Sequence, residues 1–302
     1  MKSYAERLER QRLAIFLLHG IVARPPAPGS LRNYTRKHIP VQDFEEFLAA
    51  LLERGRPLTM NEVLETCRAG QPFSDRSFAI TFDDGFANNL TVAAPVLRRF
   101  KIPACFYVTT SFVESNLMSW TDRLEDLIER APNRSARFAG GDHALADRRS
   151  RIQFLEILRR ELKSGPAAAI PPALDDLARQ CGIPLAASGT GELDRKLNWD
   201  EVRQLARDPL FTVGGHSHQH LVLAAMEPAA LEQEIRTSME ILENRLGFKP
   251  HHYSYPEGTP SAYSEAVIRE LRRHGVTCCP TAEDGINAAE ADPFRLKRIM
   301  VT

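Results

Sequence analysis

Short apolar, β-rich runs that end in polar residues constrain most strongly what this chain of 302 residues can fold into. The clearest is Phe-Ala-Ile-Thr-Phe at residues 78–82, which stops at Asp83-Asp84-Gly85. Similar runs recur at residues 13–18, 104–108, 211–213, 252–255, 276–279 and 298–301. Helical segments separate most of them, for example residues 43–54 and Pro228–Leu246, whose apolar residues recur at helical spacing. The pattern predicts an α/β fold in which strands and helices alternate.

One stretch interrupts this alternation. Between about residues 112 and 200 the sequence shows charged helical patterns and no convincing strand. We predict a single domain, residues 1–302, that carries a mainly helical insertion at 112–200. The insertion forms either a lid or wall for a substrate or a structural appendage. Trp120 and Trp199 bracket it, and packing is favoured over sugar contact for both.

Charge and hydropathy exclude several classes of partner. The 39 basic residues equal the 39 acidic ones, and no long basic run suggests nucleic acid. No segment approaches the roughly 18 apolar residues of a membrane span. The apolar run after the charged N-terminus is too short for a signal peptide, so we expect a cytoplasmic protein. The sequence does not indicate an oligomeric state.

Polar groups gather where the predicted strands end. His19 follows the first run, Asp83 and Asp84 follow the second, and a histidine cluster at residues 216–220 follows the fourth. Tyr255-Pro256-Glu257-Gly258 follows the fifth. Because parallel α/β folds form their active sites at the carboxyl ends of strands, these groups are expected to share one site.

Three of these residues have the chemistry of a catalytic metal site. Zinc and similar divalent ions accept imidazole nitrogen and carboxylate oxygen, and a catalytic site leaves a position open for water. Asp84, His216 and His220 supply such a set, and a spacing of four lets both imidazoles face one point from a helical turn or a tight loop. His218 then faces away or supports the site. We predict a divalent metal, with Zn²⁺ the most suitable.

The second aspartate is a candidate base. Asp83 would take the proton of a water whose pKa the metal lowers. Adjacent side chains point to opposite faces of a regular strand, so both aspartates reach one site only if the strand breaks there. Gly85 permits that turn.

These residues resemble a known family. Thr81-Phe82-Asp83-Asp84-Gly85 and His216-Ser217-His218-Gln219-His220 are similar to the first two motifs of the polysaccharide deacetylase family, also called the NodB homology domain or carbohydrate esterase family 4. The resemblance covers most of the chain outside the insertion. It implies a distorted (β/α)7 barrel and metal-dependent hydrolysis of an N-acyl group on a sugar, with Asp83 as base and Asp84, His216 and His220 as metal ligands.

The third motif of the family departs from its common form here. Ser254 stands where an arginine that pairs with the base is expected, and residues 253–258 resemble a Phe-Ala-Tyr-Pro-x-Gly variant. The resemblance places Tyr255 and Glu257 at the substrate, with the Glu257 backbone N–H polarising its carbonyl. Arg298, or with less support Arg295, would replace the missing guanidinium; a structural salt bridge is the alternative.

The last family motif, Leu-x-His, is absent from residues 295–302, but Leu17-Leu18-His19 has the same pattern. This looks like the permuted motif order of a bacterial branch. We therefore assign His19 as the general acid, with a structural histidine as the alternative.

The resemblance leads us to expect a metal-dependent carbohydrate N-deacetylase. Its substrate would be an N-acetyl or N-formyl amino sugar in a glycan or in a lipid-linked or nucleotide-linked precursor. A hydrolase of non-sugar amides and a catalytically silent carbohydrate-binding relative are the alternatives.

Overall fold

The computed structural model describes residues 1–132 and 134–302. Its main sheet has the strand order β10-β1-β5-β6-β9, with β4 beside β5, and every pairing in it is parallel. The strands are β1 Arg12–Leu18, β4 Arg56–Pro57, β5 Arg76–Phe82, β6 Ala104–Val108, β9 Phe211–Gly215 and β10 Ile299–Met300. This arrangement confirms the predicted α/β class.

Beyond β9 the order continues through single parallel bridges. Gly215 pairs with Tyr253, and His252 pairs with Cys278. The expected strands at 252–255 and 276–279 therefore continue the sheet beyond β9, but each is reduced to isolated bridges. Closure of the sheet into a complete (β/α)7 barrel stays a prediction.

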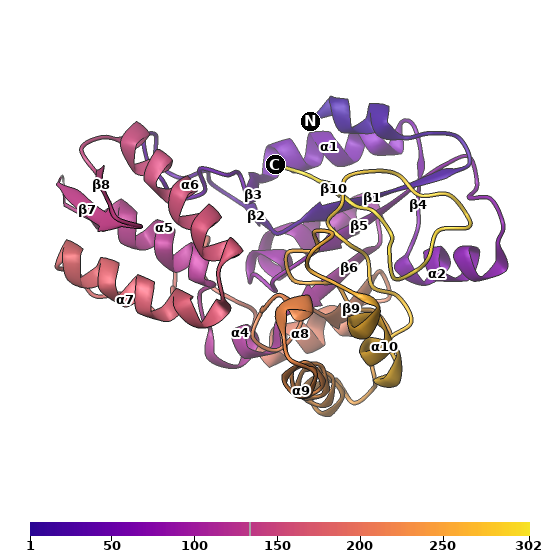
Figure 1. Cartoon of the computed structure of the whole chain (residues 1–302). Helices are drawn as coiled ribbons and strands as arrows, with labels where there is room; N and C mark the ends of the chain where they lie inside the picture. Colours follow the sequence, from indigo (N-terminus) through magenta and orange to yellow (C-terminus); the bar gives the residue numbers. More distant parts are fainter. Residues whose placement is uncertain (133) are drawn as a thin grey trace.

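Helices surround this sheet, and the two chain termini lie near each other (Figure 1). The helical elements of this part are η1 Lys2–Arg7, α1 Val41–Leu52, α2 Met60–Ala69, η2 Asn89–Ala93, α3 Ala94–Phe100, α8 Trp199–Ala206, η4 Leu223–Ala225, α9 Pro228–Leu246 and α10 Glu265–Arg273. The short strands β2 Gly20–Val22 and β3 His38–Pro40 pair separately. Within the described parts of the chain, no helix is both long and apolar enough to cross a membrane.

Most of the segment between β6 and α8 gathers at one end of the molecule, away from the sheet, whereas its first helix, residues 110–115, lies near α8 and α9 (Figure 1). The segment contains α4 Thr110–Ser115, α5 Trp120–Arg130, β7 Ser135–Phe138, β8 Gly141–Ala144, α6 Arg148–Ser164, η3 Ala167–Ala169 and α7 Ile170–Cys181.

The expectation that this stretch lacks strands is wrong, because β7 and β8 form an antiparallel hairpin. Its two-residue turn has positive φ at both Ala139 (50°) and Gly140 (80°). Such turns favour Asn-Gly or Gly-Gly, and the flanking strands are polar, so the usual sequence signals of a hairpin are weak here.

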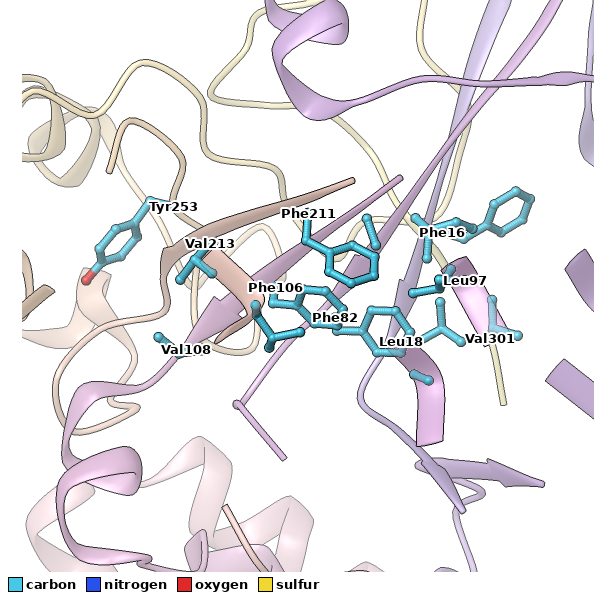
Figure 2. Packing of buried hydrophobic residues seen from close by; sticks show 14 of the residues in the cluster. Phe16, Leu18, Phe82, Leu97, Phe106, Val108, Phe211, Val213, Tyr253 and Val301 are labelled. Atoms are coloured by element: carbon cyan, nitrogen blue, oxygen red, sulfur yellow. The ribbon is translucent and has the colours of Figure 1, made fainter. Parts of the chain in front are cut away.

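Alternation along the strands separates two faces of the sheet. Phe16, Phe82 and Phe106 belong to the large core under the outer helices, whereas Ile15, Ala79 and Tyr107 belong to a smaller cluster on the other face. On the outer face the rings of Phe82 and Phe106 stack with centroids 5.0 Å apart (Figure 2). Such a pair adds roughly 0.5–1.5 kcal/mol to area burial. This period of two places Asp83 on the side of the smaller cluster.

The segment away from the sheet has a core of its own. Leu124 and Leu127 of α5 pack in one cluster with Leu155 and Leu158 of α6 and Leu177 of α7. Leu31, which precedes β3, is buried in the same cluster. The chain between β2 and β3 therefore packs against this region.

Candidate active site

Asp83 and Asp84 follow β5, and the backbone turns at Asp84. The amide of Asp83 still donates to the carbonyl of Leu18 at 3.0 Å, which continues the pairing with β1. Asp84 and Gly85 then adopt left-handed conformations with φ of 74° and 72°. A positive φ at a non-glycine residue costs on the order of 1 kcal/mol and is concentrated at functional sites. The turn brings both carboxylates to one cavity.

The histidine segment is a tight loop. After β9 the amide of His216 donates to the carbonyl of Val108 at 2.9 Å. Ser217 and His220 have φ of 64° and 58°, and the amide of His220 donates to Ser217 Oγ at 2.8 Å. The loop turns both outer imidazoles to the same point, while Nδ1 of His218 lies 2.9 Å from Thr110 Oγ1 instead.

Asp84, His216 and His220 converge on one point. Nε2 of His220 lies 3.1 Å and Nε2 of His216 lies 3.5 Å from Asp84 Oδ1. One ligand atom from each residue lies within 4.8 Å of the others. Asp84 Oδ1 is buried and has no hydrogen bond of regular geometry from the described residues. A buried oxygen of this kind is costly unless a cation binds it, and two imidazoles with one carboxylate suit zinc.

Contacts between Ser254 and the Nδ1 atom of His216 orient the His216 ring. Its Nδ1 lies 2.9 Å from the carbonyl oxygen and 2.7 Å from Oγ of Ser254. If Nδ1 carries the proton, Nε2 presents its lone pair to the site, as a metal ligand must. The serine at the position of the family's arginine therefore supports a histidine.

Asp83 forms a buried ion pair with Arg298. Nη1 and Nη2 of Arg298 donate to Oδ1 and Oδ2 of Asp83 at 2.9 and 2.8 Å, a two-bond geometry that is among the strongest available to a carboxylate. Ser254 Oγ also donates to Asp83 Oδ1 at 3.3 Å. Burial by itself would raise the pKa of Asp83, but Arg298 and His216 outweigh it and hold the pKa below its usual value. Asp83 is therefore a carboxylate at neutral pH.

Arg295, the other candidate for the guanidinium, lies at the surface. It pairs with Asp292 and Glu265 rather than with Asp83. Of the two arginines, only Arg298 occupies the buried position beside the predicted base.

The remaining predicted residues line the same cavity of about 200 Å³. Burial, opposed by Asp84, lowers the pKa of His19 to about 4, so its imidazole is neutral at pH 7. The Tyr255 hydroxyl donates to the carbonyl of Phe294 at 3.0 Å. Glu257 has φ of 62°, and its carboxylate lies 2.7 Å from Lys163 Nζ. Thus Tyr255 contributes its ring to the wall, while its hydroxyl is engaged elsewhere.

The region between β6 and α8 supplies one wall of the cavity. Its lining residues are Ser119, Trp120, Thr121, Arg159 and Lys163. Trp120 therefore faces the cavity in addition to packing against the core of that region, whereas Trp199 is buried in the core of the sheet. The sequence favours packing for Trp120, and the structure adds a place at the site.

Sequence reasoning missed Lys37, which contacts Asp84. Its Nζ lies 2.9 Å from Asp84 Oδ2 and 3.3 Å from Asp122 Oδ1. Burial disfavours the charge of Asp84, but Lys37 and His220 outweigh burial and hold the pKa of Asp84 well below its usual value. No pattern distinguishes Lys37 from the other 38 basic residues of the chain, since its partners are distant in sequence.

Comparison with known proteins identifies the family. The family model described as polysaccharide deacetylase matches residues 70–279. The chain belongs to the polysaccharide deacetylase family. The matched range holds Asp83, Asp84, His216 and His220, and it excludes His19 and Arg298. The permuted order of motifs therefore stays a prediction.

Solved structures show the same fold. The chain is similar to the Streptococcus pyogenes deacetylase PplD, with a TM-score of 0.62 and 15% identity over 96% of this chain and 92% of that one. It is similar to IcaB from Ammonifex degensii, with a TM-score of 0.63 and 17% identity over 98% and 94% of the two chains. At these identities the likeness concerns the fold alone.

A sequence relative matches over a shorter range. The poly-beta-1,6-N-acetyl-D-glucosamine N-deacetylase of Escherichia coli strain K12 is 29% identical over 86 residues. The match spans 28% of this chain and 13% of that protein.

Proposed function

We propose that this polysaccharide deacetylase family member hydrolyses an N-acetyl or N-formyl group from an amino sugar, using a divalent metal, most suitably Zn²⁺. One observation carries the proposal. A carboxylate kept charged by Arg298 lies beside a three-ligand group, with Asp83 Oδ2 3.9 Å from His216 Nε2. A base next to a metal site is the arrangement that amide hydrolysis by water requires.

Asp84, His216 and His220 would hold the metal, which when bound would supply a Lewis acid that activates water and polarises the acyl carbonyl. Asp83 accepts a proton from the attacking water. The backbone N–H of Glu257 donates to the oxygen that gains charge. His19 protonates the departing amine. Because His19 is neutral at pH 7, it takes a proton from solvent as negative charge develops on the substrate and passes it to the amine, and Asp83 then releases the proton it accepted to solvent.

The form of the substrate and the place of action are part of the proposal. We propose that the amino sugar belongs to a glycan, a lipid-linked precursor or a nucleotide-linked precursor that is met in the cytoplasm. The E. coli relative is named for a poly-N-acetylglucosamine substrate, which supports an N-acetylated sugar.

The test is release of free amine from N-acetyl and N-formyl sugars of these three forms by zinc-loaded protein. We expect wild-type release, and the Asp83→Asn variant, similar in shape and unable to accept the proton, should lose it by at least about 10²-fold. Release by wild type and variant alike would contradict the role of Asp83. Release from non-sugar amides only would contradict a sugar substrate.

A further inference from the structure

A chain of buried charges runs from the metal-binding aspartate into the region between β6 and α8. Lys37 Nζ contacts Asp84 Oδ2 at 2.9 Å, and it also contacts Asp122 Oδ1 at 3.3 Å. Lys196 Nζ lies 3.6 Å from Asp122 Oδ2. The side chains of Asp84, Asp122 and Lys196 are at most 8% exposed, and that of Lys37 is 16% exposed.

Both lysines in this chain of charges also contact an aromatic ring. The Phe86 ring lies under both ammonium groups, with its centroid 3.2 Å from Lys196 Nζ and 4.7 Å from Lys37 Nζ. The carboxylates of Asp84 and Asp122, one on each side of Lys37 Nζ, favour the charged form of the lysine. Its positive charge is thus a fixed feature of the site.

Asp122 comes from the first turn of α5. Ser119 caps that helix, accepting a hydrogen bond from the amide of Asp122 at 3.2 Å. Burial alone would raise the pKa of Asp122, but Lys37 and Lys196 lower it below its usual value, so Asp122 is ionised. The region between β6 and α8 therefore places a negative charge against the lysine that contacts the metal ligand.

Charge sets how strongly such a site attracts a cation. Asp83 is already matched by Arg298, so Asp84 is the anion left for the metal. Lys37 offsets part of the charge of Asp84, and Asp122 offsets part of the charge of Lys37. Electrostatic interactions over these distances are strong because the groups are shielded from water.

We propose that Lys37 and Asp122 are an opposed pair of positioning residues that set the metal affinity of Asp84, Lys37 by weakening it and Asp122 by strengthening it. The inference rests on the proposed function, in which Asp84 binds the metal. It also gives the region between β6 and α8 a role in the site beyond that of a wall.

The test measures zinc affinity by competition with a chromogenic chelator, using full-length wild type, Lys37→Met, Asp122→Asn and the double variant. We expect Lys37→Met to bind zinc about tenfold more tightly and Asp122→Asn about tenfold more weakly, the usual scale for groups behind metal ligands. The double variant should return toward wild type, because the two removed charges cancel. Lys37→Arg keeps the charge and should stay near wild type.

A purely structural role predicts a different pattern. If Lys37 and Asp122 only hold Asp84 in place, both single variants weaken zinc binding and the double variant is no better; that pattern, or unchanged affinity in both, overturns the inference. If Lys37→Met does not fold, the zinc affinities of Asp122→Asn and Lys37→Arg provide the test. Unchanged zinc affinity in Asp122→Asn then overturns the inference.

Failure of the proposed function has its own signature. Wild type that binds no zinc, or whose zinc binding is unaffected by His220→Ala, contradicts the metal site and the inference together. Wild type that binds zinc through His220 and releases amine, with variants that do not shift in opposite directions, contradicts the inference alone.

Discussion

Asp83 and Asp84 are neighbours in the sequence, yet the structure surrounds them differently. Both oxygens of Asp83 accept hydrogen bonds, Oδ2 from Arg298 and Oδ1 from Arg298 and Ser254. Arg298 directly precedes β10, and Ser254 directly follows the bridge residue Tyr253. Asp84 has one oxygen on Lys37 and leaves the other without a regular hydrogen bond. A satisfied carboxylate keeps its charge and position, whereas an unsatisfied one is suited to bind an ion.

His19 lines the same cavity as both aspartates, so its removal tests whether they serve one reaction. We expect His19→Ala to lower turnover by about 10²- to 10⁴-fold, the usual contribution of a general acid. Zinc content should remain near that of the wild type, because His19 is not one of the three proposed ligands. Unchanged turnover would show that His19 is structural.

Removing Arg298 should leave Asp83 without its buried ion pair. Arg298→Met leaves a buried carboxylate without its cation, which costs about 3–5 kcal/mol of unfolding free energy. Urea unfolding measures the loss. Amine release should fall as well, because Asp83 loses the partner that fixes it.

Arg295→Met is the matched control. Arg295 is an arginine of the same segment whose ion pairs lie at the surface, with a side chain 39% exposed. Such pairs contribute about 0–1 kcal/mol, so this variant should unfold close to wild type. Equal losses in the two variants would contradict a special role for the Asp83–Arg298 pair.

The same comparison shows where sequence reasoning succeeds. Asp83, Asp84 and His216 are expected at strand ends because the apolar runs that form β5 and β9 can be recognised from local sequence. The carboxyl ends of parallel strands then meet at one edge of the sheet. Arg298 was expected in the last strand for a weaker reason, the lack of an arginine at Ser254. Its contact with Asp83 depends on how β10 lies beside β1.

Lys37 and Asp122 could not be predicted from the sequence. Their contact joins a loop before β3 to the first turn of α5, 85 residues apart, and neither residue belongs to a motif. The β7–β8 hairpin was missed for another reason, because its turn uses Ala139 at positive φ. Buried charge pairs and unusual turns are set by tertiary structure rather than by local propensity.

Ser254 contacts both the predicted base, Asp83, and the proposed metal ligand His216. Removal of its hydroxyl should have the smallest effect of these changes. Ser254→Ala deletes the hydroxyl that contacts Asp83 at 3.3 Å and His216 Nδ1 at 2.7 Å. The Ser254 carbonyl still lies 2.9 Å from the same imidazole nitrogen, so the orientation of His216 is only partly lost. We expect zinc affinity to fall by about tenfold or less, at the low end for supporting hydrogen bonds. Chelator competition measures it, with Ser261→Ala at an exposed position as control. A loss much greater than tenfold would mean that the hydroxyl, rather than the carbonyl, orients His216.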